Sequence, residues 1–206
     1  KPYYSPSKTW GTYKSSAGLL VLSTPTVTVS NATSGVTIKW TKVPGATHYR
    51  IYRKTGSGSW TKVKDLKSSY TSYTDTAVKK SGGKTYYYTV KPYHSSTKTW
   101  GAFKSSSAIV RLLTPTLKSA VSSKTGITVT WGKVTGASGY IVYRKTTGGW
   151  SKIATVTGNS KVKYVDKTAK KGTTYKYTVR AFYGSAKAPK STSYFNTSGI
   201  ACKDRY

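Results

Sequence analysis

The chain repeats itself with a period of about ninety residues, and this self-similarity constrains its architecture more than any other feature. The segment TPTVTVSNATSGVTIKWTKVPGATHYRIYRK begins at Thr24, and it aligns with TPTLKSAVSSKTGITVTWGKVTGASGYIVYRK, which begins at Thr114. The sequence therefore predicts two complete repeats, residues 24–113 and 114–206, each long enough to bury a core of its own.

The first 23 residues match the end of a repeat and not its beginning. The opening KPYYSPSKTWGTYKSSAGLLVLSTPT aligns with KPYHSSTKTWGAFKSSSAIVRLLTPT, which closes the first complete repeat. We interpret residues 1–23 as the last hairpin of an incomplete preceding repeat. The alternative is that this segment supplies strands to a neighbouring domain.

Short β-strands are predicted throughout each repeat. GVTIKW places Val36, Ile38 and Trp40 on one side, with polar residues between them, and GITVTW, which ends at Trp131, repeats this alternation. Such a pattern is typical of a half-buried strand with one face toward a core, so we expect both tryptophans to be core residues. About seven strands in each repeat, with no sustained helical period, predict an all-β fold of tandem β-sandwiches.

Two motifs carry a family resemblance. WTKVPGATHY begins at Trp40 and recurs as WGKVTGASGY from Trp131, and both resemble the B to C strand segment of fibronectin type III domains. GKTYYYTV and GTTYKYTV resemble the F strand of that family, with Tyr86 and Tyr175 at the position of its tyrosine corner. The lysine-rich tandem is similar to repeats in secreted and surface proteins of gut Firmicutes. The resemblance implies tandem fibronectin type III-like β-sandwiches in an extracellular protein, secreted or attached to the cell surface, but no particular chemistry.

The charge balance favours anionic partners. The chain has 35 Lys and Arg against four Asp, which gives a formal net charge of +31. Only six of the basic residues are Arg, and Arg is the side chain that reads bases and phosphates with two parallel hydrogen bonds. This shortage argues against a nucleic-acid partner, and a charge that only maintains solubility is the alternative explanation. No apolar stretch approaches the roughly 18 residues of a membrane span.

The four carboxylates predict no catalytic site. Asp75 and Asp166 occupy the same place in the two repeats, just before the turn into the F strand, so we expect them to cap this turn. Asp65 and Asp204 have no counterpart in the other repeat, and glycoside hydrolysis requires two carboxyl groups that face one bond. We therefore predict that the chain is not an enzyme.

No metal or cofactor is predicted either. His48 and His94 face residues of other types in the aligned repeats, and Cys202 is the single cysteine. These residues have neither metal-ligand spacing nor the arrangement of a catalytic triad. A single cysteine also excludes a disulfide framework within the chain.

Trp60 and Trp150 are predicted to point away from the cores. Each lies an odd number of residues before an apolar position, Val63 or Ile153, and odd spacing on a strand places side chains on opposite faces. One interpretation is that each ring lies over lysine stems on the sheet surface. The other is that each ring is a stacking platform for a sugar.

Trp10 and Trp100 lie in the repeated string KTWG, with Tyr13 or Phe103 three residues further on. The turn between the last two strands is the expected location of both strings. One interpretation is that the ring covers the junction between consecutive sandwiches. The other is that these exposed aromatic residues contact a glycan or a protein partner.

The sequence thus predicts a non-catalytic extracellular binding or attachment module. The partner favoured by the aromatic residues is a polysaccharide, such as a cellulose-like polymer, mucin or cell-wall glycan. The alternatives are adhesion to a host glycoprotein or immunoglobulin, and a wall-associated spacer that binds anionic polymer through its charge. The candidate ligand-binding residues are Trp10, Trp60, Trp100, Trp150, Tyr13 and Phe103.

Overall fold

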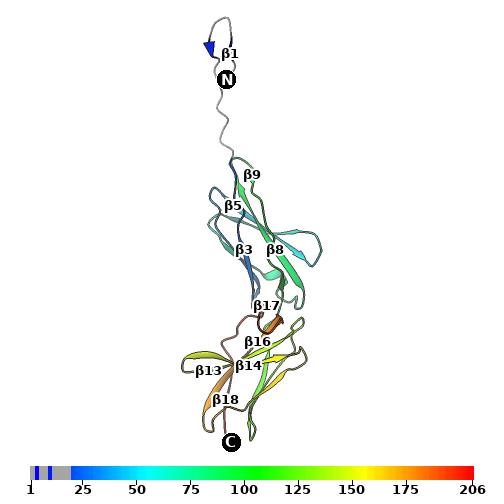
Figure 1. The fold of residues 1–206 in the computed structure, drawn as a ribbon, viewed down its shortest axis with the longest axis vertical. Coiled ribbons are helices and arrows are strands. Elements are labelled where there is room, and N and C mark those ends of the chain that lie inside the picture. Colours follow the sequence, from blue (N-terminus) through cyan, green and yellow to red (C-terminus); the bar gives the residue numbers. More distant parts are fainter. Residues whose placement is uncertain (1–2, 5–8, 11–19) are drawn as a thin grey trace.

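The computed structural model describes residues 3–4, 9–10 and 20–206 (Figure 1). Strands β1 (Tyr3–Tyr4) and β2 (Thr9–Trp10) pair in antiparallel register. Most of residues 1–23 lies outside the described part, so the interpretation of this segment as the end of a preceding repeat stays a prediction.

The strands between residues 27 and 110 form two facing sheets. The first sheet contains β3 (Val27–Ala32), β4 (Gly35–Trp40) and β7 (Ser72–Asp75) in that order. The second sheet has the order β10 (Ile109–Val110), β8 (Thr85–His94), β5 (His48–Thr55) and β6 (Thr61–Lys67), and β9 (Thr99–Trp100) pairs with the end of β8. A short 3-10 helix, η1 (Thr76–Val78), follows β7.

The strands between residues 117 and 203 repeat this arrangement. One sheet contains β11 (Leu117–Ser123), β12 (Gly126–Trp131) and β15 (Lys163–Asp166). The other has the order β14 (Gly149–Thr157), β13 (Gly139–Thr146), β16 (Thr174–Gly184) and β17 (Pro189–Thr192), with β18 (Ile200–Lys203) also paired to β16. The predicted fold class, tandem fibronectin type III-like β-sandwiches, is confirmed by these sheets.

The two hydrophobic cores are separate, although the connecting segment reaches into the second. Val110 and Leu112 precede Thr114, yet both side chains are buried in the cluster around Trp131. The division into residues 24–113 and 114–206 therefore stays a prediction, and we retain it as a working division of the chain.

A tryptophan and a tyrosine from opposite sheets meet in each core. Trp40 is buried and packs edge-on against Tyr49, with 5.6 Å between the ring centroids. Trp131 and Tyr140 form the same pair at 5.3 Å. The prediction that both tryptophans are core residues is confirmed.

The tyrosine hydroxyl of each pair also fixes the turn between the strand of the tryptophan and its own strand. Tyr49 Oη accepts a hydrogen bond from the backbone N–H of Val43 at 2.7 Å, and Tyr140 Oη accepts one from Val134 at 3.0 Å. Each of these two buried hydroxyls is thereby satisfied by a backbone N–H.

Asp75 caps the turn that follows β7, as the repeat alignment predicts. Its Oδ1 accepts a hydrogen bond from the backbone N–H of Ala77 at 3.1 Å. Its Oδ2 accepts two more, from Arg53 at 2.5 Å and from the hydroxyl of Tyr88 at 3.1 Å. The carboxylate is buried, so this aspartate is a structural anchor of the turn.

Asp166 makes the same contacts in the second sandwich. Thr168 donates its backbone N–H and its hydroxyl to Oδ1, while Arg144 and Tyr177 donate to Oδ2, each at 2.8 Å. Burial raises the pKa of Asp166, but these hydrogen bonds outweigh burial and hold the pKa below its ordinary value. Burial beside the carboxylate raises the pKa of Tyr177 far above that of a free tyrosine.

The predicted tyrosine corner is present in the second sandwich. Tyr175 Oη accepts a hydrogen bond from the backbone N–H of Lys170 at 3.1 Å, which ties β16 to the residues upstream of it. Tyr86 is buried at the equivalent position, where the guanidinium of Arg53 lies 5.7 Å from its ring. Among the residues that the structure describes, Tyr86 makes no bond of this kind.

Asn31 joins the two sandwiches. Its Nδ2 donates to the carbonyl of Val110 at 2.9 Å and to that of Thr192 at 3.0 Å. Its Oδ1 accepts from Arg111 Nη1 at 3.2 Å and from the backbone N–H of Leu112 at 3.3 Å. One buried amide thus satisfies backbone groups of the first sandwich, the connecting segment and the second sandwich.

Arg111 is almost completely buried beside Asn31, with 1% of its surface exposed. Besides Asn31, its guanidinium donates to the backbone carbonyls of Val78, Thr33, Lys79 and Leu112. Burial lowers the pKa of Arg111. Backbone carbonyl oxygens accept the hydrogen bonds of this buried guanidinium, as the carboxylates of Asp75 and Asp166 do for Arg53 and Arg144. The backbones also approach closely, because a Cβ on Gly136 would lie 2.6 Å from Cα of Gly83.

We expect Asp166→Asn to lower the free energy of unfolding of the second sandwich by roughly 3 kcal/mol, because Arg144 would keep its burial and lose its charge partner. Calorimetry resolves this as a downward shift of one transition. Since the pKa of Asp166 is lowered by folding, its contribution is complete above about pH 4 and is lost at lower pH as the carboxylate protonates. The exposed-pair variant Asp65→Asn should cost less than about 1 kcal/mol. Equal effects of the two substitutions would contradict this ranking.

Replacing Asn31 by Ala should loosen the arrangement of the two sandwiches. The carbonyls of Val110 and Thr192 would lose a buried donor, at a cost of about 1–3 kcal/mol for each unsatisfied group. Small-angle X-ray scattering should show a broader pair-distance distribution. Ser122 is the repeat equivalent of Asn31 at the far end of the second sandwich, so Ser122→Ala should leave the distribution unchanged. An unchanged distribution for Asn31→Ala would show that packing alone fixes the junction.

Candidate functional site

Four of the six predicted ligand-binding residues lie on outer sheet faces of the described structure. Trp60, Trp100 and Phe103 belong to the first sandwich, and Trp150 belongs to the second. Val63 and Ile153 pack against the cores, so Trp60 and Trp150 point outward, as the spacing predicts. Tyr13 and the side chain of Trp10 lie outside the described residues.

Trp60 is half-buried among a lysine and another aromatic ring. Lys54 Nζ lies 5.4 Å from the Trp60 ring centroid and 4.9 Å from that of Tyr87. Phe103 meets Trp60 edge-on, with 6.5 Å between the ring centroids. Trp60 therefore packs with a lysine on the sheet surface, in agreement with the first of its two interpretations.

The second sandwich contains an aromatic residue that the sequence analysis missed. Trp150 meets Phe195 edge-on at 5.9 Å, and Phe195 packs against Tyr143 at 4.8 Å. The pair Trp150–Phe195 therefore repeats the pair Trp60–Phe103. The strings AFKSS and YFNTS, which contain Phe103 and Phe195, could have indicated that these two residues are equivalent. The second string lacks a preceding Trp-Gly pair, so the two were not aligned.

Equivalent hydrogen bonds show that the two phenylalanines correspond. Thr89 in β8 donates its hydroxyl to the carbonyl of Lys104, the residue after Phe103. Thr178 in β16 donates to the carbonyl of Asn196, the residue after Phe195. Each threonine thus holds an irregular segment across the outer face of its sheet.

Trp100 is the most exposed tryptophan of residues 20–206, with 39% of its surface accessible. Its ring lies against Tyr93 at 4.4 Å between centroids, with Arg50 at 4.8 Å and Lys91 at 5.6 Å. Strand β9, which carries Trp100, lies at the end of the first sandwich that faces away from the second (Figure 1). Trp100 therefore does not lie at the junction with the second sandwich, which Asn31 and its neighbours form. The interpretation that its ring covers a junction between consecutive sandwiches stays a prediction for the end of the first sandwich that faces away from the second.

A cavity of about 260 Å³ opens beside Trp100. Its walls combine aromatic rings with groups that form hydrogen bonds, and they consist of His48, Tyr49, Arg50, Asp65, Tyr93 and Trp100. The combination of a flat apolar ring and convergent polar groups is typical of small-molecule binding sites.

Arg50 and Asp65 form the polar wall of this cavity. The guanidinium donates from Nε to Oδ1 at 2.6 Å and from Nη2 to Oδ2 at 3.1 Å, which is a bidentate pair. Lys62 also donates to Oδ2, at 3.2 Å. The hydrogen bond from Arg50 holds the pKa of Asp65 below its ordinary value, so the carboxylate is charged at neutral pH. Sequence reasoning did not single out this aspartate, because its partner lies on the neighbouring strand.

The second sandwich has no equivalent of this cavity wall. The repeat alignment and strand register place Gly139, Ile141 and Phe182 at the positions of His48, Arg50 and Tyr93. Ile141 and Phe182 are buried, and the KTWG string does not recur there. The second sandwich can therefore serve as an internal control, because it has the same fold as the first but lacks the side chains that line this cavity.

The described residues contain no group of three or more His, Cys, Asp or Glu side chains that could hold a metal ion. In the same part of the chain, none of the helices has the length and apolar character needed to cross a membrane.

No protein-family model and no curated protein matches this chain. Among solved structures, it is similar to a segment of two fibronectin type III domains from chicken tenascin, at 17% identity and a TM-score of 0.40, over 87% of this chain and 98% of that one. It is also similar to the FN1–FN3 domains of chicken CNTN1, at 20% identity and a TM-score of 0.35, over 84% of this chain and 64% of that one.

Fluorescence quenching should rank the tryptophans by exposure. Replacing Trp100 by Phe should lower the fraction of emission that acrylamide quenches, because this variant loses an exposed indole. Replacing Trp131 by Phe should raise that fraction, because Trp131 is completely buried. A quenched fraction that Trp100→Phe leaves unchanged would show that the Trp100 ring is covered in solution.

Proposed function

We propose that the chain is a non-catalytic extracellular binding module that holds polysaccharide through the cavity beside Trp100. The observation that carries this proposal is the exposed Trp100 ring next to the bidentate Arg50–Asp65 pair. The flat face of an indole covers the apolar face of a pyranose ring. A carboxylate and a guanidinium at its edge supply an acceptor and donors for sugar hydroxyls.

The position of the two cations favours binding from the solvent side of the ring. Arg50 and Lys91 are register partners on β5 and β8, so both approach Trp100 from the sheet beneath it. We infer that the accessible part of the indole faces away from the sheet. A sugar bound there would lie between the ring and solvent, without displacing either cation.

The aromatic surface of the first sandwich extends beyond one sugar ring. Lys91 Nζ lies 5.7 Å from the ring of Phe103, and Phe103 in turn contacts Trp60. Trp60, Phe103 and Trp100 therefore form a connected surface across the sheet. An extended polymer suits such a surface better than a single monosaccharide does.

A protein partner, such as a host glycoprotein or immunoglobulin, is the second candidate. It is favoured by exposed tyrosines at several separate positions, which are Tyr70, Tyr183, Tyr194 and Tyr206. Tyrosine provides a large contact area at low entropic cost, as in antibody binding sites. Binding to a host protein that persists after glycosidase has removed the glycans of that protein would favour this candidate over polysaccharide.

Trp100→Ala should lower retention on a bound polysaccharide tenfold or more, since a central aromatic contact carries much of the binding free energy. We would measure retention on insoluble cellulose, mucin and purified cell wall in 0.1 M and 1 M salt. Asp65→Asn should also weaken binding, while calorimetry shows the fold intact.

Trp150→Ala is the matched control for this experiment. It removes an outward-facing tryptophan from β14 of the second sandwich, where the cavity is absent, and should change retention by less than about threefold. Equal losses from Trp100→Ala and Trp150→Ala would refute the assignment of the site. Loss of all binding in 1 M salt would instead support a spacer that holds anionic polymer by charge alone.

A further inference from the structure

His48 lines the Trp100 cavity, and the proposed function gives it no part. Its side chain is exposed, and Arg50 lies two residues further along β5 on the same outer face. In the strand register, His48 is opposite Tyr93 on β8, and Tyr93 is opposite Trp100 on β9. Because the guanidinium of Arg50 lies 4.8 Å from the Trp100 ring centroid, the indole extends across β8 toward β5. His48 therefore lies beside the ring on which a sugar would stack.

The hydroxyl of Thr47 holds the imidazole of His48. Nδ1 of the ring lies 3.0 Å from Thr47 Oγ1. The same oxygen accepts a hydrogen bond from the backbone N–H of Ser95 at 2.9 Å, and it donates to the carbonyl of Tyr93 at 3.0 Å. A hydroxyl has one proton and two lone pairs. All three hydrogen bonds therefore form together only when Nδ1 of His48 carries a hydrogen and donates it.

These contacts favour one tautomer of the neutral ring. In the other tautomer, Nδ1 would have to accept the proton of the hydroxyl, and Thr47 would lose its hydrogen bond to Tyr93. The Nδ1–H tautomer thus has one more hydrogen bond, and it leaves Nε2 as an acceptor. Within the described part of the chain, no residue forms a hydrogen bond with Nε2. This nitrogen is available to a ligand.

A free acceptor is what the rest of the polar wall has least of. Arg50 has only donors. Asp65 already accepts two hydrogen bonds from Arg50 and one from Lys62, out of about four that a carboxylate can accept. Sugar hydroxyls are donors as well as acceptors, so a bound sugar needs acceptors in the wall. His48 Nε2 supplies one that no other contact uses.

His48 also makes the cavity sensitive to pH, because imidazole is the side chain whose charge changes between pH 5 and 8. Asp65 stays charged in that range, since the hydrogen bond from Arg50 holds its pKa below the ordinary value. A protonated His48 would have no acceptor. The charged and titratable groups on the elements packed around it are Tyr49 and Arg50 on β5, Lys62, Asp65 and Lys67 on β6, Lys91, Tyr93 and His94 on β8, and Lys98 in the turn before β9.

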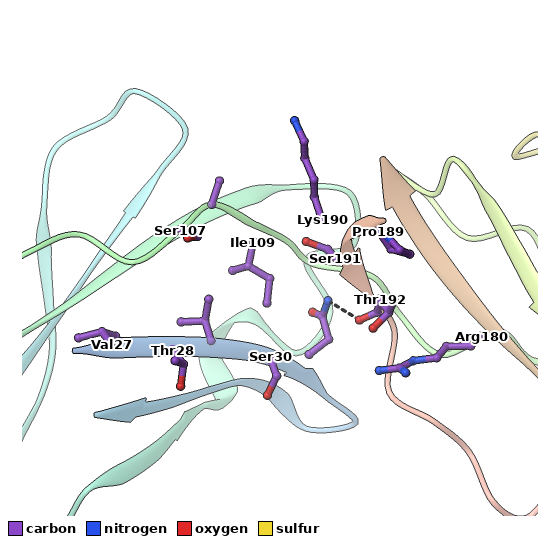
Figure 2. A pocket seen from close by; sticks show the side chains of 13 residues that line it. Val27, Thr28, Ser30, Ser107, Ile109, Arg180, Pro189, Lys190, Ser191 and Thr192 are labelled. Carbon is purple, nitrogen blue, oxygen red and sulfur yellow. Dashed lines mark hydrogen bonds between the residues drawn. The ribbon is translucent and has the colours of Figure 1, made fainter. Parts of the chain in front are cut away.

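The cavity at the junction of the two sandwiches has a different composition. Its volume is about 340 Å³, and β3, residues 107–109, Arg180 and β17 form its walls. Figure 2 shows Lys190 extending away from it and Arg180 at its far end. None of the described residues that line it is an aromatic residue, a histidine or an aspartate. It therefore offers neither a stacking surface nor a group whose charge changes between pH 5 and 8.

We propose that His48 orients the sugar in the Trp100 cavity, with Nε2 accepting a hydrogen bond from a sugar hydroxyl, and that protonation of His48 weakens this binding. The inference rests on the proposed function, since it takes the ligand of this cavity to be a sugar. It adds a specificity-determining residue and the pH dependence that follows from it. Protonation removes the acceptor, and a sugar that covers the charged ring removes part of its hydration.

Nitrogen NMR of the full chain with labelled histidine tests the tautomer without any ligand. At pH 8 the signals of His48, which the variant His48→Gln identifies, should be those of the Nδ1–H form. Thr47→Ala removes the hydroxyl that accepts from Nδ1, and it should raise the population of the Nε2–H form. An Nε2–H form as the major species of the parent chain would overturn the proposal.

Retention on insoluble cellulose, mucin and purified cell wall, measured at pH 5 and pH 8 in 0.1 M salt, tests the role in binding. The parent chain should be retained about threefold or more better at pH 8, which corresponds to one hydrogen bond. His48→Ala should lose a similar factor at pH 8. His48→Gln places an amide oxygen that does not titrate near the position of Nε2. It should be retained within about threefold of the parent at pH 8, with no further loss at pH 5.

His94→Gln is the matched control. It removes the other histidine of the chain, which does not line the cavity, and it should keep the pH dependence of the parent. Arg180→Gln, at the junction cavity, should keep it as well. Calorimetry should show that His48→Gln leaves the first sandwich folded, since His48 is exposed.

Each outcome separates this inference from the proposed function. Retention that depends on pH equally in the parent and in His48→Gln would overturn the inference alone, because the chain would still bind polysaccharide. Stronger retention of the parent at pH 5 would also overturn it, since protonated His48 would then act as a cation toward the polymer. Retention on none of the three polymers would overturn the proposed function and this inference together.

Discussion

In each sandwich a buried tryptophan from one sheet packs edge-on against a buried tyrosine from the other, and the outer surface depends on this contact. Because Tyr49 points inward on β5, its neighbours Arg50 and Tyr52 are directed to the outer face of the same strand. A shift of one residue in this strand would bury Arg50 and expose Tyr49. The core contact thereby sets which side chains are available near Trp100.

The outer face of the first sandwich is organised by cations that lie against aromatic rings. Lys54 contacts Trp60, Lys91 contacts Phe103, and Arg50 contacts Trp100. A chain with a net charge of +31 and four aspartates cannot pair most of its cations with carboxylates, and aromatic faces offer another favourable environment. Each contact contributes about 0.5–1 kcal/mol at an exposed site. These contacts hold the aromatic residues on the surface. Arg50 contacts the Trp100 ring and also pairs with the carboxylate of Asp65.

Local patterns were enough to predict most of the fold. Period-two alternation identified the strands that end at Trp40 and Trp131, and the aligned positions of Asp75 and Asp166 identified two capping residues. Such features depend on neighbours along the chain or on the repeat itself.

The junction and the two cavities depend on contacts that no local pattern contains. Asn31 and Arg111 are 80 residues apart, and Arg50 meets Asp65 because β5 and β6 pair in one particular register. No local pattern indicates that β9 lies at the end of the first sandwich away from the second, so the sequence could not show which junction Trp100 is near (Figure 1). Phe195 was missed because the segment between β17 and β18 departs from the repeat in sequence, although Phe195 packs on Trp150 as Phe103 packs on Trp60.

The most direct test of the account is an indole titration by nuclear magnetic resonance. The six tryptophans give separate Nε1–H signals, which single Trp→Phe variants assign. On addition of soluble fragments of a bound polysaccharide, we expect the largest shift at Trp100, a smaller one at Trp60, and none at the buried Trp131. Shifts confined to Trp150, or no change at Trp100 while the protein is bound, would contradict the account.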